Sequence, residues 1–448
     1  MKQILWFRRD LRVEDSAILA HAKEEVLPIF IFDKHILKQL PKEDKRITFI
    51  YQCVLELKKR LQALKLDLAI FFDEPQNVFK KLKEMGFDEV LCSVDFDAYA
   101  KQRDEEIEKI IPLKRYIDAF ILNPALHLKK DQTPYKVFTP FYKSLSMISQ
   151  SKHIDEYKRN ENLKKIKFDY STIPSLAQLG FQKQILPHFL TLNGFELLDA
   201  FQTKMSSYEK NRDYFNKDAS SKLSVHLRFG LISPKQLFNC IRLSPNNRGE
   251  FFIKELFWRE FYNYILFHFP KSQESNFNGL KISWNDSEED FKRWCEGKTG
   301  VPIVDAAMIH LNQTGLMHNR LRMVVASFLT KNLFINWKKG EAYFAQKLLD
   351  YEASSNIGSW QWCASTGADA APYFRIFNPY NQSKKFDKEG VFIKSVIKEF
   401  EHIDDRVFHI ENGVQSNVFI TYPKAMVDIK LSRQRAIERF KEAKNELF

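Results

Sequence analysis

Five short apolar runs in the first 128 residues alternate with segments of helical pattern, and no other feature constrains the fold as strongly. Stretches such as residues 49–65, which separate the runs, carry apolar residues every three or four positions. Short, nearly continuous apolar strands separated by helices predict a parallel sheet covered on both faces. We therefore predict a doubly wound, Rossmann-like α/β domain over residues 1–128. The predicted strands are ILWF (4–7), VLPIFIF (26–32), LDLAIFF (66–72), EVLCSV (89–94) and AFIL (119–122).

The rest of the chain has a different pattern. The turn after the first strand, RRDLRVED, lacks the GxGxxG of a dinucleotide-binding half, so we expect any cofactor to bind elsewhere. Residues 129–194 are polar with scattered prolines and predict an interdomain connector with helical pieces. Residues 195–448 contain no alternating strand pattern and predict an all-α domain. Its clearest expected helices are 251–269, which is apolar on nearly every side, 304–313 and 319–334.

Charge and cysteine content narrow the classes of function. Lys and Arg number 69 against 57 Asp and Glu, a net charge of +12. This excess favours a polyanionic partner such as nucleic acid, although a basic surface without a binding role fits equally well. The five cysteines never form CxxC, which argues against a disulfide scaffold or a zinc knuckle. With a charged N-terminus and no membrane-length apolar run, the sequence predicts a cytoplasmic protein with no membrane partner and no metal site.

Four stretches place polar groups where a helical domain should be apolar: residues 206–234, 254–261, 318–323 and 348–379. In the first, Arg212 and nearby serines before a helix could bind phosphate, or simply cap that helix. In the second, Glu255 and Arg259 are i,i+4 neighbours on a helix. They could form an ordinary ion pair, or the Glu255 carboxylate could have a functional role beside a cavity. Together the four stretches predict a pocket for a large planar heterocycle carrying phosphates.

The fourth stretch contains SWQWC, with two tryptophans two positions apart. On a helix, Trp360 and Trp362 point about 200° apart, so they cannot line one face. Asn356 precedes Trp360 by four residues and shares its face if the helix is continuous.

Five motifs occur in order along essentially the whole chain: LWFRRDLRVEDSAIL, YKVFTPF, KTGVPIVDAAM, GLMHNRLRM and WQWCASTGADAAPYFRIFNP. They closely resemble the photolyase/cryptochrome flavoprotein family, and most of all its class I cyclobutane pyrimidine dimer (CPD) photolyases. The resemblance implies an N-terminal antenna-chromophore domain and a C-terminal helical domain that binds FAD in a U shape.

The resemblance implies a set of FAD-binding residues. Asn356 would face flavin N5, where its amide can accept from a protonated N5 or donate to an unprotonated one, and Arg322 and Asp350 would bracket the isoalloxazine ring. Trp360, Trp337 and Trp284 match the chain of tryptophans that conducts an electron to the flavin. The remaining implied contacts are Tyr208, Arg212, Ser220, Ser221, Lys222, Leu223, Ser224, Phe252, Glu255, Arg259, Asn319 and Glu352.

The implied substrate is a cyclobutane pyrimidine dimer flipped out of DNA. In the implied reaction, light-excited reduced FAD (FADH⁻) gives an electron to the dimer, two C–C bonds split and the electron returns. Glu255 resembles the carboxyl that stabilises charge on the dimer. Trp258 and Trp362 match the residues that stack on the dimer, and Asn319, Arg320 and Met323 match further dimer contacts.

Three residues depart from the family pattern: Glu352 stands where Asp is frequent, Phe252 where tryptophan is frequent and Ser220 where threonine is usual. The resemblance is loose at the acidic residue that contacts the antenna chromophore, which would be Asp97. The identity of the antenna therefore stays open: methenyltetrahydrofolate, a deazaflavin, a second flavin or no antenna at all.

Three related functions are alternatives. A (6-4) photolyase uses a histidine pair in its pocket, whereas the last three of the four stretches contain a single histidine, His318. A cryptochrome photoreceptor usually carries a long extension, whereas this chain ends in a charged segment, KLSRQRAIERFKEAKNELF, expected to be a plain solvated helix. A DASH protein generally lacks the second tryptophan, here Trp362.

We expect a monomer with contacts to DNA phosphates at Arg375, Lys384 and Lys385.

Overall fold

The computed structural model describes residues 1–150, 153–243, 249–417 and 420–446, with the side chains of residues 148–150 excepted. By their contacts these residues form two units. Unit 1 comprises residues 1–135, 139–206 and 221–270, and unit 2 comprises residues 136–138, 207–220 and 271–448.

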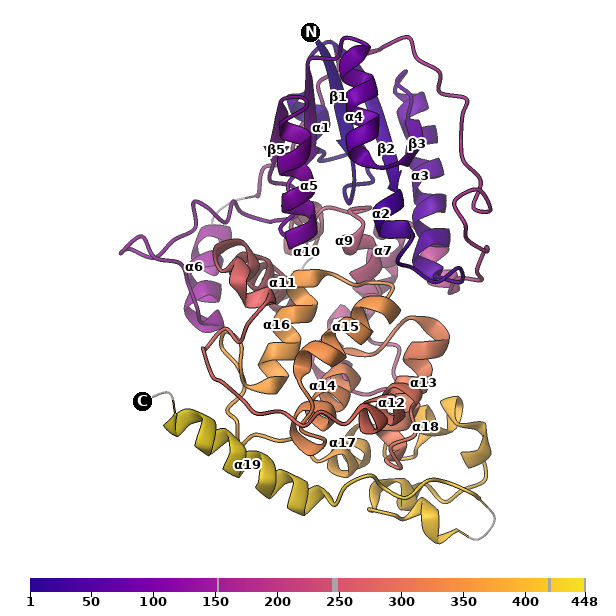
Figure 1. Ribbon diagram of the computed structural model, residues 1–448, viewed down its shortest axis with the longest axis vertical. Helices are drawn as coiled ribbons and strands as arrows, with labels where there is room; N and C mark the ends of the chain where they lie inside the picture. Colours follow the sequence, from indigo (N-terminus) through magenta and orange to yellow (C-terminus); the bar gives the residue numbers. More distant parts are fainter. Residues whose placement is uncertain (151–152, 244–248, 418–419, 447–448) are drawn as a thin grey trace. The chain divides into compact units, whose positions relative to one another are not determined.

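A parallel sheet forms the centre of unit 1, with strand order β3-β2-β1-β4-β5 (Figure 1). All residues of β1 and β2 except the first of each are buried, because helices cover both faces of the sheet. Helices α4 and α5 supply Val78, Phe79, Leu82 and Ile107 to the core on one face. The predicted doubly wound α/β domain is confirmed. Its elements are β1 (Lys2–Phe7), α1 (Ala17–His21), β2 (Glu25–Asp33), α2 (Lys34–Leu37), α3 (Lys45–Ala63), β3 (Ala69–Asp73), α4 (Pro75–Glu84), β4 (Glu89–Ser93), α5 (Ala98–Glu108) and β5 (Leu113–Tyr116).

One predicted strand is wrong. The last strand of the order is β5, whose sequence LKRY is half polar because it lies at the sheet edge. The apolar run at 119–122 follows it and forms no strand. Its backbone is held by a side chain instead: the N–H groups of Ile121 and Leu122 donate to the buried carboxylate of Glu260, at 2.9 and 3.2 Å from Oε1.

The predicted connector contains more structure than expected, and the boundary at residue 195 does not match the units. Residues 164–165 form β6, which pairs in parallel with β2. Helices α9 to α11 belong to unit 1, where Arg259 donates to the carbonyl oxygen of Ala119 at 3.0 Å. The elements of this part are α6 (Phe138–Gln150), β6 (Lys164–Lys165), η1 (His188–Thr191), α7 (Gly194–Met205), α9 (Ser224–Arg228), α10 (Pro234–Arg242) and α11 (Glu250–His268).

Helices dominate unit 2, and its core is built largely from α13 to α16. The helices predicted within 251–269 and 304–313 are confirmed as α11 and α13. The one predicted over 319–334 is α14 followed by the π-helical turn η4. The elements of unit 2 are α8 (Tyr208–Asn211), α12 (Glu288–Glu296), α13 (Pro302–Thr314), α14 (Asn319–Ser327), η4 (Phe328–Asn332), α15 (Trp337–Lys347), α16 (Ala353–Ala364), α17 (Pro379–Phe386), α18 (Val391–Val396), η5 (Lys398–Phe400), η6 (Asp405–His409), η7 (Val414–Ser416) and α19 (Ile429–Asn445); η3 (Pro270–Gln273) begins at the last residue of unit 1.

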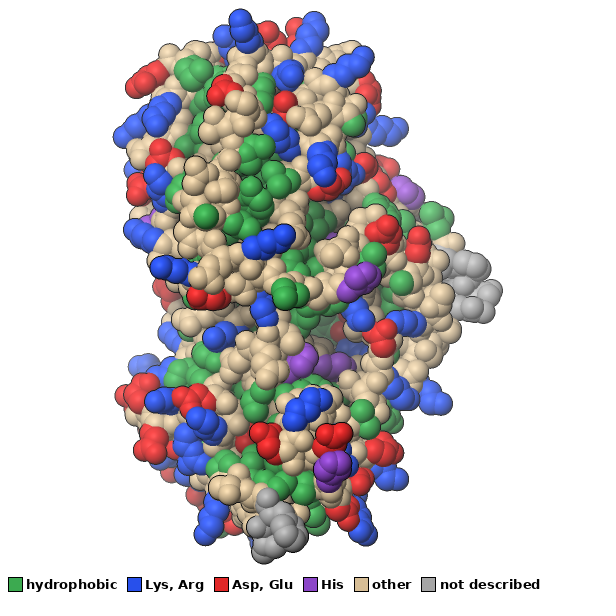
Figure 2. Space-filling view, turned by 90° about the vertical axis from the view of Figure 1, so that its right-hand side faces the viewer, with side chains coloured by type: hydrophobic (Ala, Val, Ile, Leu, Met, Phe, Trp, Pro, Cys, Tyr) green, Lys and Arg blue, Asp and Glu red, His purple; other side chains and the backbone are tan. Residues whose placement is uncertain are grey.

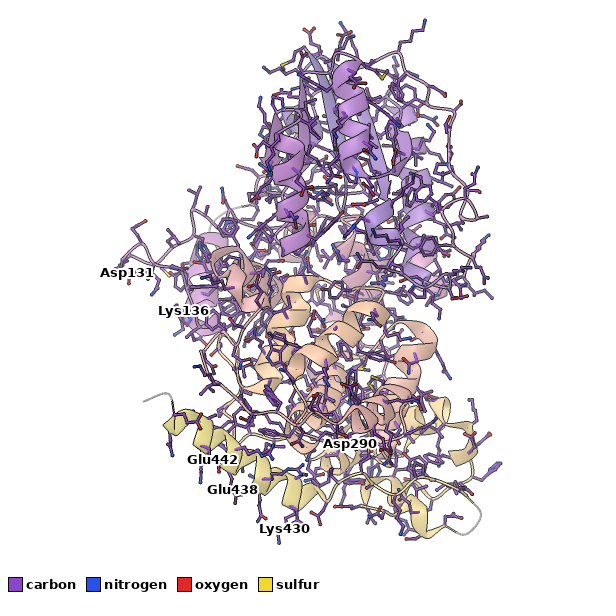
Figure 3. The ribbon with its side chains drawn as sticks, in the orientation of Figure 1. Asp131, Lys136, Asp290, Lys430, Glu438 and Glu442 are labelled. Atoms are coloured by element: carbon purple, nitrogen blue, oxygen red, sulfur yellow. The ribbon has the colours of Figure 1, made fainter. Side chains whose placement is uncertain are left out.

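The C-terminal helix α19 is not the plain solvated helix that its charge predicts. Ala436 and Phe440 are fully buried and pack with Phe334, with Trp284 and Tyr373 beside them. Only the outer side of α19 is solvated, where Lys430, Glu438 and Glu442 are exposed (Figure 3). Its buried apolar residues stand at positions 429, 436, 440 and 443, an amphipathic stripe that the high charge content masks.

Candidate functional site

Helix α16 carries three of the predicted site residues. It runs without interruption from Ala353 to Ala364, so Asn356 and Trp360 lie one turn apart. Trp360 is 2% exposed and packs at 5.0 Å, centroid to centroid, from Phe344. Trp362 is only partly buried. The two tryptophans therefore have the different surroundings that their spacing predicts.

The amide of Asn356 is bound by Glu341 on the neighbouring helix α15. Its Nδ2 donates to Glu341 Oε1 at 2.9 Å and to the Glu341 carbonyl oxygen at 3.1 Å. Burial raises the pKa of the Glu341 carboxyl, while the hydrogen bond from Asn356 favours its charged form. Sequence reasoning missed Glu341, because nothing in its local pattern signals a contact with a residue 15 positions later.

Arg322 and Asp350 form a direct ion pair. The Arg322 Nη2 lies 2.8 and 3.0 Å from the two Asp350 oxygens, and its Nε donates to the Met317 carbonyl oxygen at 3.0 Å. The family resemblance implies that these residues bracket a ring, and the structure joins their charged groups directly.

His318 begins helix α14. Its Nδ1 accepts from the backbone N–H of Arg320 at 3.1 Å, which caps the helix. Burial lowers the pKa of His318 to about 4, so the ring is neutral at physiological pH. A neutral ring that accepts at Nδ1 carries its proton on Nε2.

The predicted dimer contacts of α14 differ in exposure. Asn319 is exposed, and Met323 packs partly against the core of unit 2. Arg320 pairs with Asp213 at 2.5 Å, a partner that sequence reasoning missed. The guanidinium of Arg320 also lies 4.9 Å from the ring centroid of Phe386.

The remaining tryptophans of the predicted electron chain belong to the same core cluster of unit 2, Trp337 within it and Trp284 packed against it. Trp337 is 1% exposed, and its Nε1–H donates to Asn276 Oδ1 at 2.8 Å. Trp284 is partly buried, 5.0 Å from Phe334 and 6.1 Å from Phe440 between ring centroids. Sequence reasoning missed Trp294, which is fully buried with its ring centroid 6.1 Å from that of Trp360.

The predicted phosphate-binding segment is divided between the units. In unit 2, the guanidinium of Arg212 lies 5.3 Å from the ring of Tyr208, and Ser220 is exposed. In unit 1, Ser221 Oγ accepts from the backbone N–H of Leu223 at 3.4 Å. Lys222 adopts φ = 57°, and Ser224 is the first residue of α9.

Four predicted site residues lie on α11 of unit 1. Phe252 is buried and its ring centroid lies 4.7 Å from that of Phe201. Glu255, Trp258 and Arg259 are all partly buried. They form a half-buried stripe on a helix whose other sides are mostly apolar and buried.

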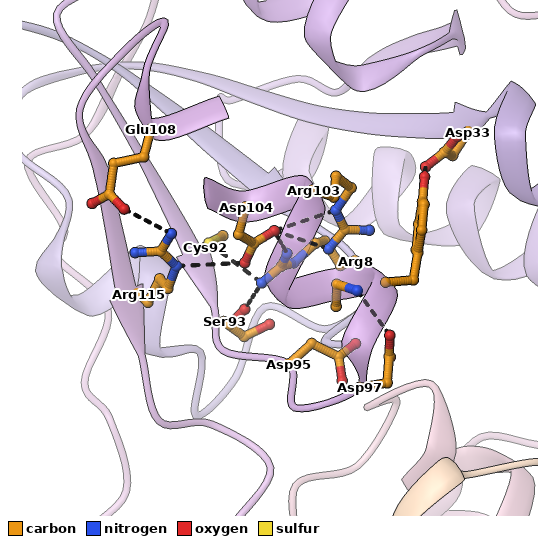
Figure 4. A network of polar contacts seen from close by, with 12 residues as sticks. Arg8, Asp33, Cys92, Ser93, Asp95, Asp97, Arg103, Asp104, Glu108 and Arg115 are labelled. Carbon is orange, nitrogen blue, oxygen red and sulfur yellow. Dashed lines mark hydrogen bonds and ion pairs between the residues drawn. The ribbon is translucent and has the colours of Figure 1, made fainter. Parts of the chain in front are cut away.

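The carboxyl ends of β1 and β4 hold a network of charged side chains (Figure 4). Arg8 pairs with Asp104 at 2.7 Å and Arg103 pairs with the same carboxylate at 3.1 Å. Asp97, the loose antenna match, caps α5 by accepting from the Ala100 N–H at 2.8 Å. The Asp97 carboxylate therefore has a structural role, and the structure offers no support for it as an antenna contact.

Charge is not concentrated on the visible face of Figure 2, where Lys and Arg side chains are interspersed with Asp and Glu. Arg375, Lys384 and Lys385, the expected phosphate contacts, are all exposed. No group of three or more His, Cys, Asp or Glu among the described residues is arranged to hold a metal ion. Among the residues that the structure describes, no helix is both long enough and apolar enough to cross a bilayer.

Comparison with known proteins assigns the family. Residues 3–158 match the model for DNA photolyase, and residues 252–442 match the model for the FAD binding domain of DNA photolyase. A deoxyribodipyrimidine photo-lyase of Alkalihalophilus pseudofirmus is 35% identical over 98% of this chain and 97% of its own.

Solved structures agree with this assignment. An archaeal photolyase of Sulfolobus tokodaii with two FAD molecules has a TM-score of 0.85 and 32% identity, covering 99% of this chain and 100% of its own. A bacterial class III photolyase of Agrobacterium tumefaciens has a TM-score of 0.84 and 31% identity, covering 99% and 98%. The likeness thus extends beyond the class I enzymes. On this full-length similarity, the chain belongs to the DNA photolyase family.

Proposed function

We propose that this chain repairs cyclobutane pyrimidine dimers in DNA under blue light, with FAD as its cofactor. The observation that carries the proposal is α16, which within seven residues presents a buried amide whose oxygen has no hydrogen-bond partner among the described residues, a buried tryptophan and a partly exposed tryptophan. These are the groups that the reaction needs next to a flavin: a partner for the ring, an electron relay and a surface for the damaged bases. Full-length relatives named deoxyribodipyrimidine photo-lyase support the same reaction.

The residues present fit FAD. Among the described residues no hydrogen bond reaches Asn356 Oδ1, so this oxygen is available to a ligand. Bound FAD would supply light absorption and the electron for dimer splitting. In unit 2 we assign Asn356, Arg322 and Asp350 to the flavin ring and Tyr208, Arg212 and Ser220 to the phosphates. Glu352 and Asn319 complete the unit 2 set. In unit 1 we assign Ser221, Lys222, Leu223, Ser224, Phe252, Glu255 and Arg259.

The substrate contacts in the proposal are aromatic and polar. We assign Trp258 and Trp362 to stacking on the dimer, and Glu255 to a hydrogen bond with the thymine edge. Asn319, Arg320 and Met323 complete the contacts. The relay is Trp360, Trp337 and Trp284. We expect a second chromophore as antenna, either methenyltetrahydrofolate or a deazaflavin. We also expect a monomer that acts in the cytoplasm, on the nucleoid in a bacterium.

Binding of DNA to the protein in the dark tests the substrate class. The purified chain should release FAD on denaturation and should bind a duplex with one thymine cyclobutane dimer about a hundredfold more tightly than the undamaged duplex, because two bases stack in the site. A duplex with a (6-4) product is the control and should bind like undamaged DNA. Equal affinity for all three duplexes, or the absence of FAD, would overturn the proposal.

A further inference from the structure

We infer that Glu341 is a positioning residue for the flavin: it orients the amide of Asn356 so that only the amide oxygen can face the ring. The inference rests on the proposed function, because it takes Asn356 as the residue that faces flavin N5. It adds a residue that the sequence motifs do not mark, and it selects between two roles of Asn356 that the sequence leaves open.

The geometry of the amide carries the inference. The Asn356 amide nitrogen has two hydrogens, and both are directed at Glu341, one at Oε1 (2.9 Å) and one at the backbone carbonyl oxygen (3.1 Å). A carbonyl oxygen and an ionised carboxylate can only accept. Rotating the amide by 180° would place Oδ1 against two acceptor oxygens, so Glu341 excludes that orientation.

The surrounding packing holds Glu341 in place. Its neighbour Gly340 lets α15 approach α16 closely, because a Cβ at Gly340 would lie 2.2 Å from Trp360 Cη2. Tyr351 O–H reaches Glu341 Oε1 at 3.4 Å from the segment between the two helices. The Glu341 backbone oxygen belongs to α15 itself, so half of the orienting contact is as rigid as the helix.

The orientation has a chemical consequence. Asn356 Oδ1, which has no hydrogen-bond partner among the described residues, can only accept. Flavin N5 carries a hydrogen when the ring is reduced and a lone pair when it is oxidised. An acceptor at this position stabilises the N5–H form and repels the oxidised form. Glu341 thus favours reduced flavin, the form that the proposed repair reaction uses.

The test is the midpoint potential of the bound FAD. Glu341→Leu removes one of the two acceptors and so weakens the preference for this amide orientation, while the backbone carbonyl remains. The equilibrium constant for two-electron reduction should therefore fall about tenfold, which corresponds to about 30 mV. Glu341→Gln keeps an acceptor oxygen and should stay within about threefold of wild type. Glu442→Leu, a loss of an exposed carboxylate on α19, is the matched control and should leave the potential unchanged.

Several results would overturn the inference: a Glu341→Leu potential equal to wild type, or a Glu341→Gln shift as large as that of Glu341→Leu. Circular dichroism and FAD content verify folding. Where the leucine variant does not fold, Asn356→Leu replaces it, and an unchanged potential in that variant also overturns the inference. Failure of the proposed function is distinct, because the wild-type chain would then hold no FAD or would not repair dimers.

Discussion

Trp360 and Trp362 lie two positions apart on α16 in different surroundings. The ring of Trp360 is enclosed by Phe344 and Trp294, which leaves it 2% exposed. Trp362 keeps part of its surface accessible. A buried indole in an aromatic core suits electron transfer, and an accessible one suits stacking on bases. Substitution of single residues can separate these two roles.

Trp362→Ala should weaken binding of dimer DNA by about 1–3 kcal/mol, since it removes one stacking surface, and leave flavin photoreduction intact. Trp337→Phe should slow photoreduction, while enzyme reduced beforehand still repairs. The measurements are dark binding and the rate of flavin bleaching under blue light. Trp294→Phe is a matched control, because Trp294 is also buried beside Trp360 but lies outside the proposed relay. Equal effects of the first two changes on both assays would contradict this division.

Lys331 gives a pH dependence at the residue scale. It is fully buried, donates to Ser365 Oγ at 2.8 Å and to the Ala364 carbonyl oxygen at 3.2 Å, and lies 3.6 Å from the ring centroid of Phe440. Burial lowers its pKa from 10.5 to about 7. Between these values the unfolded chain binds more protons than the folded chain, so the free energy of unfolding should rise with pH from about 7 to about 10.

Lys331→Met should flatten this rise, because the folded and unfolded forms of the variant no longer differ in protonation at this position. Denaturant unfolding at several pH values between 7 and 10 measures the slope. A variant with the same slope as wild type would show that Lys331 is not its source.

At the scale of elements, α19 supports the surface around Trp284. Phe440 is fully buried and lies 5.8 Å from Phe334 and 6.1 Å from Trp284 between ring centroids. Arg439 ties the helix to the same region by donating to Asn285 Oδ1 at 2.8 Å. The last element of the chain thus helps to build the surroundings of the outermost tryptophan of the proposed relay.

Phe440→Ala should lower the free energy of unfolding by about 3–5 kcal/mol, because it leaves a cavity among aromatic rings. It should also make Trp284 more accessible to an external fluorescence quencher. Glu442→Ala on the exposed side of α19 should change stability by no more than about 0.5 kcal/mol. Equal losses in the two variants would contradict the packing role of the helix.

At the scale of the whole molecule, the periodicity of apolar residues predicted the α/β and all-α architecture well. It predicted the limits of individual strands and domains less well. The buried strands β1 to β4 appear in the sequence as apolar runs and could be recognised. The edge strand β5 could not, because two of its four residues are charged. The run at 119–122 resembled a strand because its backbone partner, Glu260, is 139 residues away from Ile121. Similarly, α9 to α11 group with the sheet through contacts that no local pattern records.

The candidate site was predictable to the extent that its residues belong to motifs. Asn356, Arg322 and Asp350 stand in recognisable stretches, and the structure places the last two in one ion pair. Glu341 and Asp213 stand in no motif and are found only because helices pack together, so their roles required the structure.

The most direct test of the account is repair itself. The purified chain, with its FAD reduced beforehand, is mixed with an oligonucleotide containing one thymine cyclobutane dimer and divided between darkness and blue light. We predict that dimers disappear only in the illuminated sample, while the flavin remains reduced. Dimers that persist under light with the flavin still reduced would contradict the account and favour a photoreceptor role.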